Sequence, residues 1–126
     1  MIIGVGNDLL KTARIEKSME NKRFLEFCFS SSERAAFCER SDAAKKLAGC
    51  FAAKEALGKA LGTGVRGFSL SEVSVLRDEL GKPYFVFSGA AKALIDEKKA
   101  VAHLALSNTE EFVTATVILE EKYENI

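Results

Sequence analysis

The sequence has few residues of the kinds that build metal clusters or disulfide frameworks, and it has no excess of positive charge. Its 126 residues include three cysteines, one histidine, one proline and no tryptophan, and 18 basic residues balance 18 acidic ones. A net charge of zero argues against a general binder of nucleic acid or membrane surfaces. The cysteines form no CxxC pair and have no histidine nearby, so we expect neither a zinc site nor disulfides. Cys28, Cys38 and Cys50 are expected to be reduced and mostly buried, in a cytoplasmic protein.

Long apolar runs, repeats and linkers are also absent from the sequence. No run approaches the length of a membrane span, and Asp8, Lys11 and Arg14 follow the first apolar residues too early for a secretory signal. The 48% of hydrophobic residues suffice for one core. We therefore predict a single domain over residues 1–126.

The segment 51–64, FAAKEALGKALGTG, predicts a helix that is nearly all apolar or small and still carries charges. Residues at steps of three or four form one apolar stripe: Leu47, Cys50, Ala53, Leu57 and Ala60. Glu55 is expected on another side, one turn after Phe51, in a partly dry environment. A carboxylate there must be paired, hydrogen-bonded or bound to a metal. Gly62 is expected to end the helix as a left-handed cap.

Two interpretations of Glu55 and Lys59 are open from this pattern. They stand one turn apart in the favourable order, which fits an exposed helical ion pair contributing about 0.3 kcal/mol. However, Gly58 and Gly62 share their face, and a glycine inside a helix costs about 1 kcal/mol relative to alanine. A face that must let a bulky anion approach the helix closely would explain that cost.

The N-terminal residues Met1–Leu10 predict a strand, because β-branched residues precede turn-forming ones. A period of two places Gly4, Gly6 and Asp8 on one face. Glycines inside a strand often mark the close approach of another backbone. We expect the long helix to pack over this face and to bring Glu55 near Asp8. The dinucleotide-binding fingerprint is not met, because its third glycine is missing.

Residues 12–29 predict one amphipathic helix. Its inward residues are expected to be Ile15, Met19, Phe24 and Phe27, and its outward ones Arg14, Lys17, Lys22 and Arg23. The basic face is either simply solvated or a docking surface for an acidic partner. Ser30 and Glu33 fit a capping box that begins a second helix, with a break near Ser41 before the long one.

The rest of the chain predicts two hairpins and one helix. Strands are expected at 73–77 and 83–87, and at 101–107 and 112–119, with a charged tail after them. Ser88 is expected to cap a helix over residues 90–98, and His103 to have a structural role within its strand. These elements predict an α+β domain with a mainly antiparallel sheet packed against the long central helix, all helices on one side.

Three blocks of the chain resemble the holo-acyl-carrier-protein synthases, the small single-domain branch of the 4′-phosphopantetheinyl transferases. The blocks are GVGNDLLKTARIE, GCFAAKEALGKALGTG and DELGKPYFVF. They follow the order and spacing of the family and span almost the whole chain. The resemblance implies that fold, and transfer of the 4′-phosphopantetheine group of coenzyme A to a serine of an apo acyl carrier protein, for fatty acid biosynthesis. Adenosine 3′,5′-bisphosphate would be released.

The resemblance also implies a catalytic set. Asp8 and Glu55 fall on the two metal-binding positions of the family, where a hard cation such as Mg²⁺ takes carboxylate oxygens. Lys59 matches a residue that neutralises the phosphates as charge develops on the leaving group. Glu55 is also the implied base for the serine proton, directly or through a metal-bound water.

Further matches concern the two substrates. Thr63, with the neighbouring glycine amides and Lys59, is implied to bind phosphate oxygens of coenzyme A. Gly81, Lys82 and Pro83 fall where the family holds the adenine end.

The acidic carrier protein is implied to dock on the basic face of residues 12–29. Arg14 and Arg23 match basic docking positions of the family, and Lys22 would assist them. A homotrimer with sites between subunits is implied by the same analogy.

Two departures from the family pattern affect the expected binding of coenzyme A. Cys50 stands where an arginine is common, so one phosphate contact is either missing or supplied by Lys45 or Lys46. Asn108 stands where many members have a histidine, and asparagine cannot carry charge at neutral pH. A non-catalytic coenzyme A or nucleotide-binding module and a plain interaction domain therefore stay open beside the transferase.

Overall fold

The computed structural model of the chain describes residues 1–123. Its elements are β1 (Ile2–Lys11), α1 (Thr12–Ser18), α2 (Lys22–Cys28), α3 (Ser31–Phe37), α4 (Ala43–Leu61), the short 3-10 helix η1 (Leu70–Glu72), β2 (Val73–Arg77), β3 (Pro83–Phe87), α5 (Gly89–Glu97), β4 (Ala100–Asn108) and β5 (Phe112–Glu121). Of the predicted charged tail, residues 124–126 lie outside the described part. Among the described residues, no helix is both long and apolar enough to cross a membrane.

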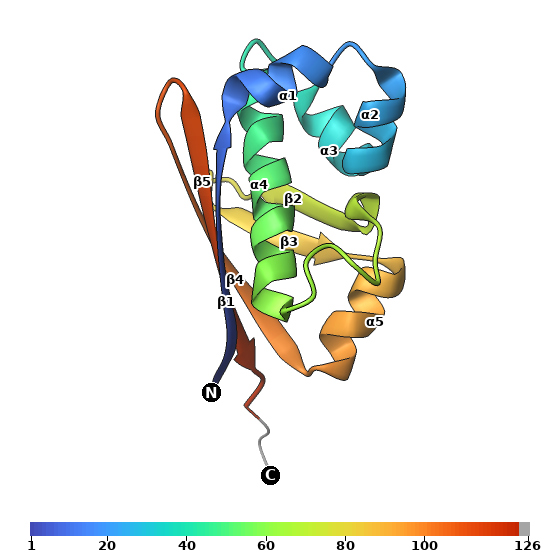
Figure 1. The fold of residues 1–126 in the computed structure, drawn as a ribbon, viewed down its shortest axis with the longest axis vertical. Coiled ribbons are helices and arrows are strands. Elements are labelled where there is room, and N and C mark those ends of the chain that lie inside the picture. The colour runs from blue at the N-terminus through green and yellow to red at the C-terminus, as the bar shows by residue number, and fades with distance from the viewer. Residues whose placement is uncertain (124–126) are drawn as a thin grey trace.

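A three-stranded antiparallel sheet in the order β1-β5-β4 forms one wall of the molecule. Helix α4 lies along one face of this sheet, and the other helices lie on the same side, as Figure 1 shows. The predicted α+β class, the antiparallel pairing and the central helix are confirmed.

Glycines in β1 allow α4 to approach the sheet closely. A Cβ atom added at Gly4 would collide with the carbonyl group of Ala60, and one at Gly6 with that of Ala56. No larger residue fits between these two backbones. The expectation that the long helix packs over the glycine face of the first strand is therefore confirmed.

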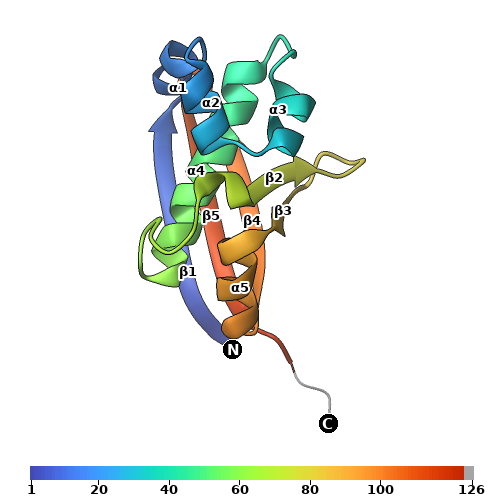
Figure 2. The same cartoon turned by 90° about the vertical axis from the view of Figure 1, so that its right-hand side faces the viewer.

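Strands β2 and β3 form a separate two-stranded antiparallel sheet. β3 contacts β4, which is the edge of the larger sheet opposite β1. Figure 2 accordingly shows the tip of this hairpin on the other side of the molecule from β1. This placement matters for the site described below.

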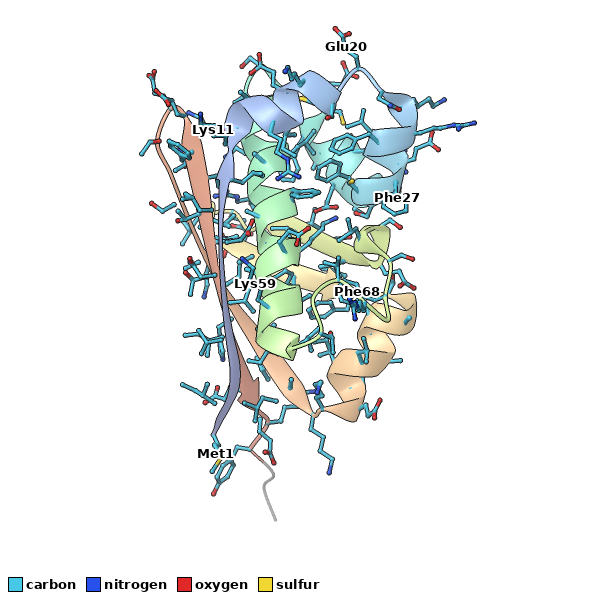
Figure 3. The ribbon with its side chains drawn as sticks, in the orientation of Figure 1. Met1, Lys11, Glu20, Phe27, Lys59 and Phe68 are labelled. Carbon is cyan, nitrogen blue, oxygen red and sulfur yellow. The ribbon has the colours of Figure 1, made fainter. Side chains whose placement is uncertain are left out.

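One predicted helix is in fact two. Residues 12–29 form α1 and α2, separated at Met19–Asn21, because Asn21 caps α2 by accepting a hydrogen bond from the Phe24 N–H (3.2 Å). The change of direction turns Phe27 outward, where 72% of its surface is exposed (Figure 3). The predictions of a continuous helix and of an inward Phe27 were wrong.

Two of the other predicted helix boundaries follow local rules, and a third does not. Ser30 and Glu33 form the predicted capping box, and Gly62 ends α4 with a left-handed φ of 81°. Ser88 stands at the start of α5, but its side chain makes no capping bond. Glu72 replaces it, since its carboxylate accepts a hydrogen bond from the Ala90 N–H (2.8 Å). The predicted role of Ser88 was therefore wrong.

Candidate active site

Lys59 joins α4 to β1 at the centre of the proposed site. Its ammonium group donates to the backbone carbonyl of Asn7 (2.9 Å) and to Oδ1 of Asp8 (3.1 Å). The Lys59 side chain is 54% exposed and that of Asp8 only 16%. Figure 3 labels Lys59 where α4 faces β1. The helical ion pair between Glu55 and Lys59, one of the two interpretations left open by the sequence, is not found among residues 1–123, where Lys59 pairs with Asp8.

The packing of β1 on α4 predicts which turn of the helix lies beside Asp8. Gly4 packs on Ala60 and Gly6 on Ala56, so β1 and α4 run in opposite directions. Two strand residues and four helix residues each advance about 6 Å. Asp8 is therefore expected level with Ala52, beside the turn of α4 that runs from Ala52 to Glu55.

The carboxylates of Glu55 and Asp8 differ in burial and in hydrogen bonding. Glu55 is half-buried, and no hydrogen bond or ion pair of its side chain is found within the part of the chain described here. Asp8 is mostly buried and has the Lys59 ammonium as its partner. Among residues 1–123, no group of three or more acidic, cysteine or histidine side chains is arranged to hold a metal. A cation here would take two protein carboxylates and complete its shell with ligand oxygens and water, which suits Mg²⁺.

A surface pocket of about 470 Å³ opens at the C-terminal end of α4. It is lined by Leu61, Gly62, Thr63, Arg66, Gly67, Leu94 and Lys98. Thr63 thus lies in a pocket that also contains two cations, Arg66 and Lys98. Sequence reasoning missed both, although Arg66 follows the glycine-rich turn by only two residues.

Gly58 lies against the backbone of the loop that follows α4. A Cβ atom there would lie 2.6 Å from the carbonyl carbon of Gly64, whose N–H donates to the Gly58 carbonyl (3.0 Å). The glycine therefore leaves room for the chain's own loop after α4, which explains its presence in the helix without an anion. The loop that it accommodates carries Thr63.

The hairpin residues Gly81, Lys82 and Pro83 are not brought to Asp8 within one copy of the chain. They lie at the turn between β2 and β3, on the side of β4, whereas Asp8 lies on β1 at the opposite edge of the sheet (Figure 2).

The predicted docking residues are exposed on two short helices, α1 and α2. Arg14 projects from α1, and Lys22 and Arg23 lie in the first turn of α2, all exposed. Lys22 makes a distant ion pair with Glu26 (3.9 Å). The exposed ring of Phe27 lies on the same short helix.

The departures from the family pattern have distinct environments. Cys50 is buried and its thiol donates to the Val75 carbonyl (3.6 Å), and burial raises the pKa of this thiol well above its usual range. Lys45 and Lys46 are half-buried in the first turn of α4, and Asn108 is exposed at the end of β4.

His103 lies in β4, as expected, with Nε2 3.1 Å from Oε1 of Glu120.

Sequence reasoning missed a buried ion pair next to Glu55. Lys54 and Glu33 are both fully buried, with Nζ and Oε1 2.6 Å apart. Burial lowers the pKa of the Lys54 ammonium, and the Glu33 carboxylate opposes that shift. The spacing contains the signal, because Lys54 falls between Cys50 and Leu57 at apolar-stripe intervals.

Comparison with known proteins now defines the class. The chain belongs to the 4′-phosphopantetheinyl transferase superfamily, whose family model matches residues 4–117. Among curated proteins, it is 38% identical to the holo-[acyl-carrier-protein] synthase of Fusobacterium nucleatum subsp. nucleatum over 121 residues, which cover 94% of this chain and 99% of the relative.

Two solved structures share the fold. The holo-[acyl-carrier-protein] synthase of Neisseria meningitidis has a TM-score of 0.89 at 33% identity, covering 96% of this chain and 100% of that one. The synthase of Bacillus anthracis str. Ames, solved in complex with CoA (3′,5′-ADP), has a TM-score of 0.82 at 34% identity, covering 97% and 99%. The likeness thus extends over sequence and fold together.

Proposed function

We propose that this chain transfers the 4′-phosphopantetheine group of coenzyme A to a serine hydroxyl of an apo acyl carrier protein. The observation that carries the proposal is the meeting of α4 and β1, where Lys59 holds Asp8 and the Glu55 carboxylate has no partner among residues 1–123. Full-length similarity to holo-[acyl-carrier-protein] synthases, one of them solved with CoA, supports the choice of substrates.

In the proposed reaction, the serine oxygen forms a bond to the phosphorus that bears the pantetheine arm. The bond from that phosphorus to the bridging oxygen breaks, and adenosine 3′,5′-bisphosphate leaves. Glu55 accepts the serine proton, directly or through water. Lys59 offsets the negative charge on the phosphates, and Thr63 with Arg66 binds phosphate oxygens in the pocket at the end of α4.

Asp8 and Glu55 would hold Mg²⁺. Both offer the hard oxygen ligands that this ion prefers. When bound, the ion would neutralise pyrophosphate charge and fix the donor's orientation. Lys59 would then give up Asp8 and turn its ammonium to the phosphates.

We further propose that the chain works as a homotrimer. Within the described part of the chain, no helix lies on the outer face of the three-stranded sheet (Figure 1), and Ile3, Val5 and Leu9 of β1 expose apolar surface. A neighbouring copy on this face would cover it and bring its own Gly81–Pro83 hairpin toward Asp8. The adenine end of coenzyme A would then be held between subunits.

The acceptor is proposed to dock through the basic surface of α1 and α2. Arg14 on α1 and Lys22 and Arg23 on α2 are all exposed, and α2 also carries the exposed ring of Phe27, a combination that suits an acidic helical partner. The three cysteines are free, which fits a reducing compartment, the cytoplasm.

Mass spectrometry of an apo acyl carrier protein incubated with coenzyme A, Mg²⁺ and the enzyme tests the proposal. We expect a gain of one phosphopantetheine mass, abolished by a chelator and restored by added Mg²⁺. Asp8→Asn and Glu55→Gln should slow transfer by about 10²-fold or more, because each removes charge from the reacting centre. Glu39→Gln, an exposed carboxylate outside the site, serves as the control.

The contrary outcome has a definite meaning. If the wild type binds coenzyme A but transfers nothing, the chain is a binding module, and the buried Cys50 in place of an arginine becomes the main explanation. Transfer that survives both carboxylate substitutions would refute the assigned roles of Asp8 and Glu55.

A further inference from the structure

One buried ammonium group ties three other segments to α4. The Lys54 side chain is fully buried, and its Nζ donates to the Cys28 carbonyl (2.7 Å), Glu33 Oε1 (2.6 Å) and the Leu70 carbonyl (3.0 Å). These four groups are called the Lys54 clamp. All three donor sites of the ammonium are therefore used, and its charge lies 5.1 Å from the centre of the Phe29 ring.

Each acceptor of the clamp belongs to a different element. Cys28 is the last residue of α2, Glu33 lies in the first turn of α3, and Leu70 begins η1. Glu33 extends the network, because Oε1 also accepts from the Ser30 N–H (2.9 Å) and Oε2 from the Val75 N–H (2.9 Å). The network therefore joins α2, α3, η1 and β2 to α4, at the residue next to Glu55.

Stability alone does not account for this arrangement. Replacing a buried ion pair by apolar residues of similar volume is often neutral or stabilising, so such a pair is weak support for a purely structural role. The clamp instead fixes the orientation of the segments that it joins. Each hydrogen bond from the ammonium restrains either a backbone carbonyl or the Glu33 carboxylate, which also accepts hydrogen bonds from two backbone N–H groups. It acts where precise placement matters, one residue before Glu55.

The position of helix α2 depends on the clamp more than the position of the loop after α4, which lines the proposed coenzyme A pocket. Cys28, at its end, has a carbonyl that lacks a helical partner and meets the Lys54 ammonium. The loop after α4 has other anchors, namely the Gly64 N–H to Gly58 carbonyl bond and the Glu72 carboxylate, which accepts from the Ser69 N–H (2.8 Å). Loosening the clamp should therefore move α2 first.

We propose that Lys54 is a positioning residue for the acceptor. It fixes α2, which bears Lys22 and Arg23, relative to Glu55, and so decides where the serine of a docked carrier protein arrives. This inference rests on the proposed function. It predicts that loss of Lys54 affects the carrier protein and not coenzyme A, because the loop at the coenzyme A end of the site has its own hydrogen bonds.

The test measures both substrates in Lys54→Met. We expect kcat/KM for the carrier protein to fall by about 10-fold to 100-fold, since a misplacement of 1 Å can cost that much. Calorimetric Kd for coenzyme A should stay within about 2-fold, with the stoichiometry unchanged, as expected for a site whose contacts are intact. Rates are normalised to the coenzyme A sites counted by calorimetry, which removes the effect of unfolded protein.

A double-mutant cycle with Arg23→Ala gives the readout that a merely structural role would not move. If Lys54 acts by placing α2, the effects of Lys54→Met and Arg23→Ala on kcat/KM for the carrier are less than additive. Ile95→Ala, a cavity in α5 that also lowers stability, is the control and should combine additively with Arg23→Ala. Full additivity for Lys54→Met would overturn the inference. An equal fold-loss in kcat/KM for the carrier protein and in affinity for coenzyme A would overturn it too.

A second variant covers the case in which Lys54→Met does not fold. Glu33→Gln with Lys54→Met leaves no unpaired buried charge and keeps an oxygen acceptor for the Ser30 N–H, so it carries the same test. A wild type without transfer activity would refute the proposed function, whereas normal acceptor kinetics in the folded variants, with an active wild type, would refute only the role of Lys54.

Discussion

Individual carboxylates in this chain serve more than one segment at once. Glu33 completes the capping box of α3 and also bonds Lys54 and the Val75 N–H. Glu72 caps η1 at Ser69 and also caps α5 at Ala90. Two oxygens with several lone pairs allow this double use. Such residues connect elements that hydrophobic packing alone would leave free to shift.

Glu72 gives a prediction that depends on pH. Backbone N–H groups of Ser69 and Ala90 hold the pKa of the Glu72 carboxyl below its ordinary value of 4.5. The folded state therefore binds this proton less readily than the unfolded state. The stability that the carboxylate contributes is complete above pH 4.5 and is lost as the pH falls through the lower folded pKa.

Urea unfolding of the wild type and Glu72→Gln at several pH values checks this. We expect the wild type to be more stable at neutral pH, and the difference in the free energy of unfolding to shrink as the pH falls below 4.5. A difference that stays constant over this range would show that the charge of Glu72 does not matter.

At the scale of elements, contact between backbones decides how α4 sits. β1 approaches α4 through Gly4 and Gly6, and the loop after α4 returns over Gly58. These three contacts position the residues proposed for catalysis. Asp8 lies two residues after Gly6, and Thr63 lies directly before Gly64, whose backbone packs on Gly58. The helix is thus held on two sides by neighbours that tolerate no added methyl group.

Two glycines of the same helix provide a matched comparison. Gly58→Ala should lower stability by about 1–3 kcal/mol, despite the better helix propensity of alanine, because its Cβ meets the Gly64 backbone. It should also weaken coenzyme A binding by displacing the loop that carries Thr63.

Gly49→Ala is the control for this change. Its Cβ would lie 3.5 Å from Cδ1 of Leu106, an ordinary contact, so we expect unchanged or higher stability, by up to about 1 kcal/mol. Thermal unfolding and calorimetry measure both effects. Equal behaviour of the two variants would contradict the role given to the returning loop.

At the scale of the whole molecule, the helices of residues 1–123 cover only one face of the three-stranded sheet (Figure 1). Its outer face carries exposed apolar side chains on β1, of which Val5 is 60% exposed, beside a hydrogen bond from the Asn7 amide to Thr116 Oγ1 (2.9 Å). The hairpin that would complete the donor site lies at the far edge of the same copy. Both features are consistent with an assembly in which neighbours supply what one copy lacks.

Analytical ultracentrifugation tests the trimer. The wild type should sediment with about three times the mass of one chain, and Val5→Lys should sediment as a monomer, because the charge would have to be buried in the interface. The monomer is expected to lose transfer activity while keeping its fold by circular dichroism. Val86→Lys, a similarly exposed apolar position on β3, is the control. A monomeric wild type with full activity would refute the proposal.

Much of the fold could be predicted from the sequence because local signals were strong. The Ser30–Glu33 capping box, the left-handed Gly62 and the turn at 78–82 each act within a few residues. The exceptions arose where a distant group or a weaker local signal competed. Asn21 divided a helix that periodicity alone would continue, and Glu72, not Ser88, capped α5.

The sequence by itself determined the chemistry available to this protein: Asp8, Glu55 and Lys59 at spacings that match a transferase family, on a strand and a helix that glycines allow to meet. Only the tertiary structure decided the partners. It paired Lys59 with Asp8 instead of Glu55, buried Lys54 against Glu33, and placed the Gly81–Pro83 hairpin away from Asp8. The physical reason is that charge pairing and burial depend on distances between segments far apart in the chain, which no local pattern encodes.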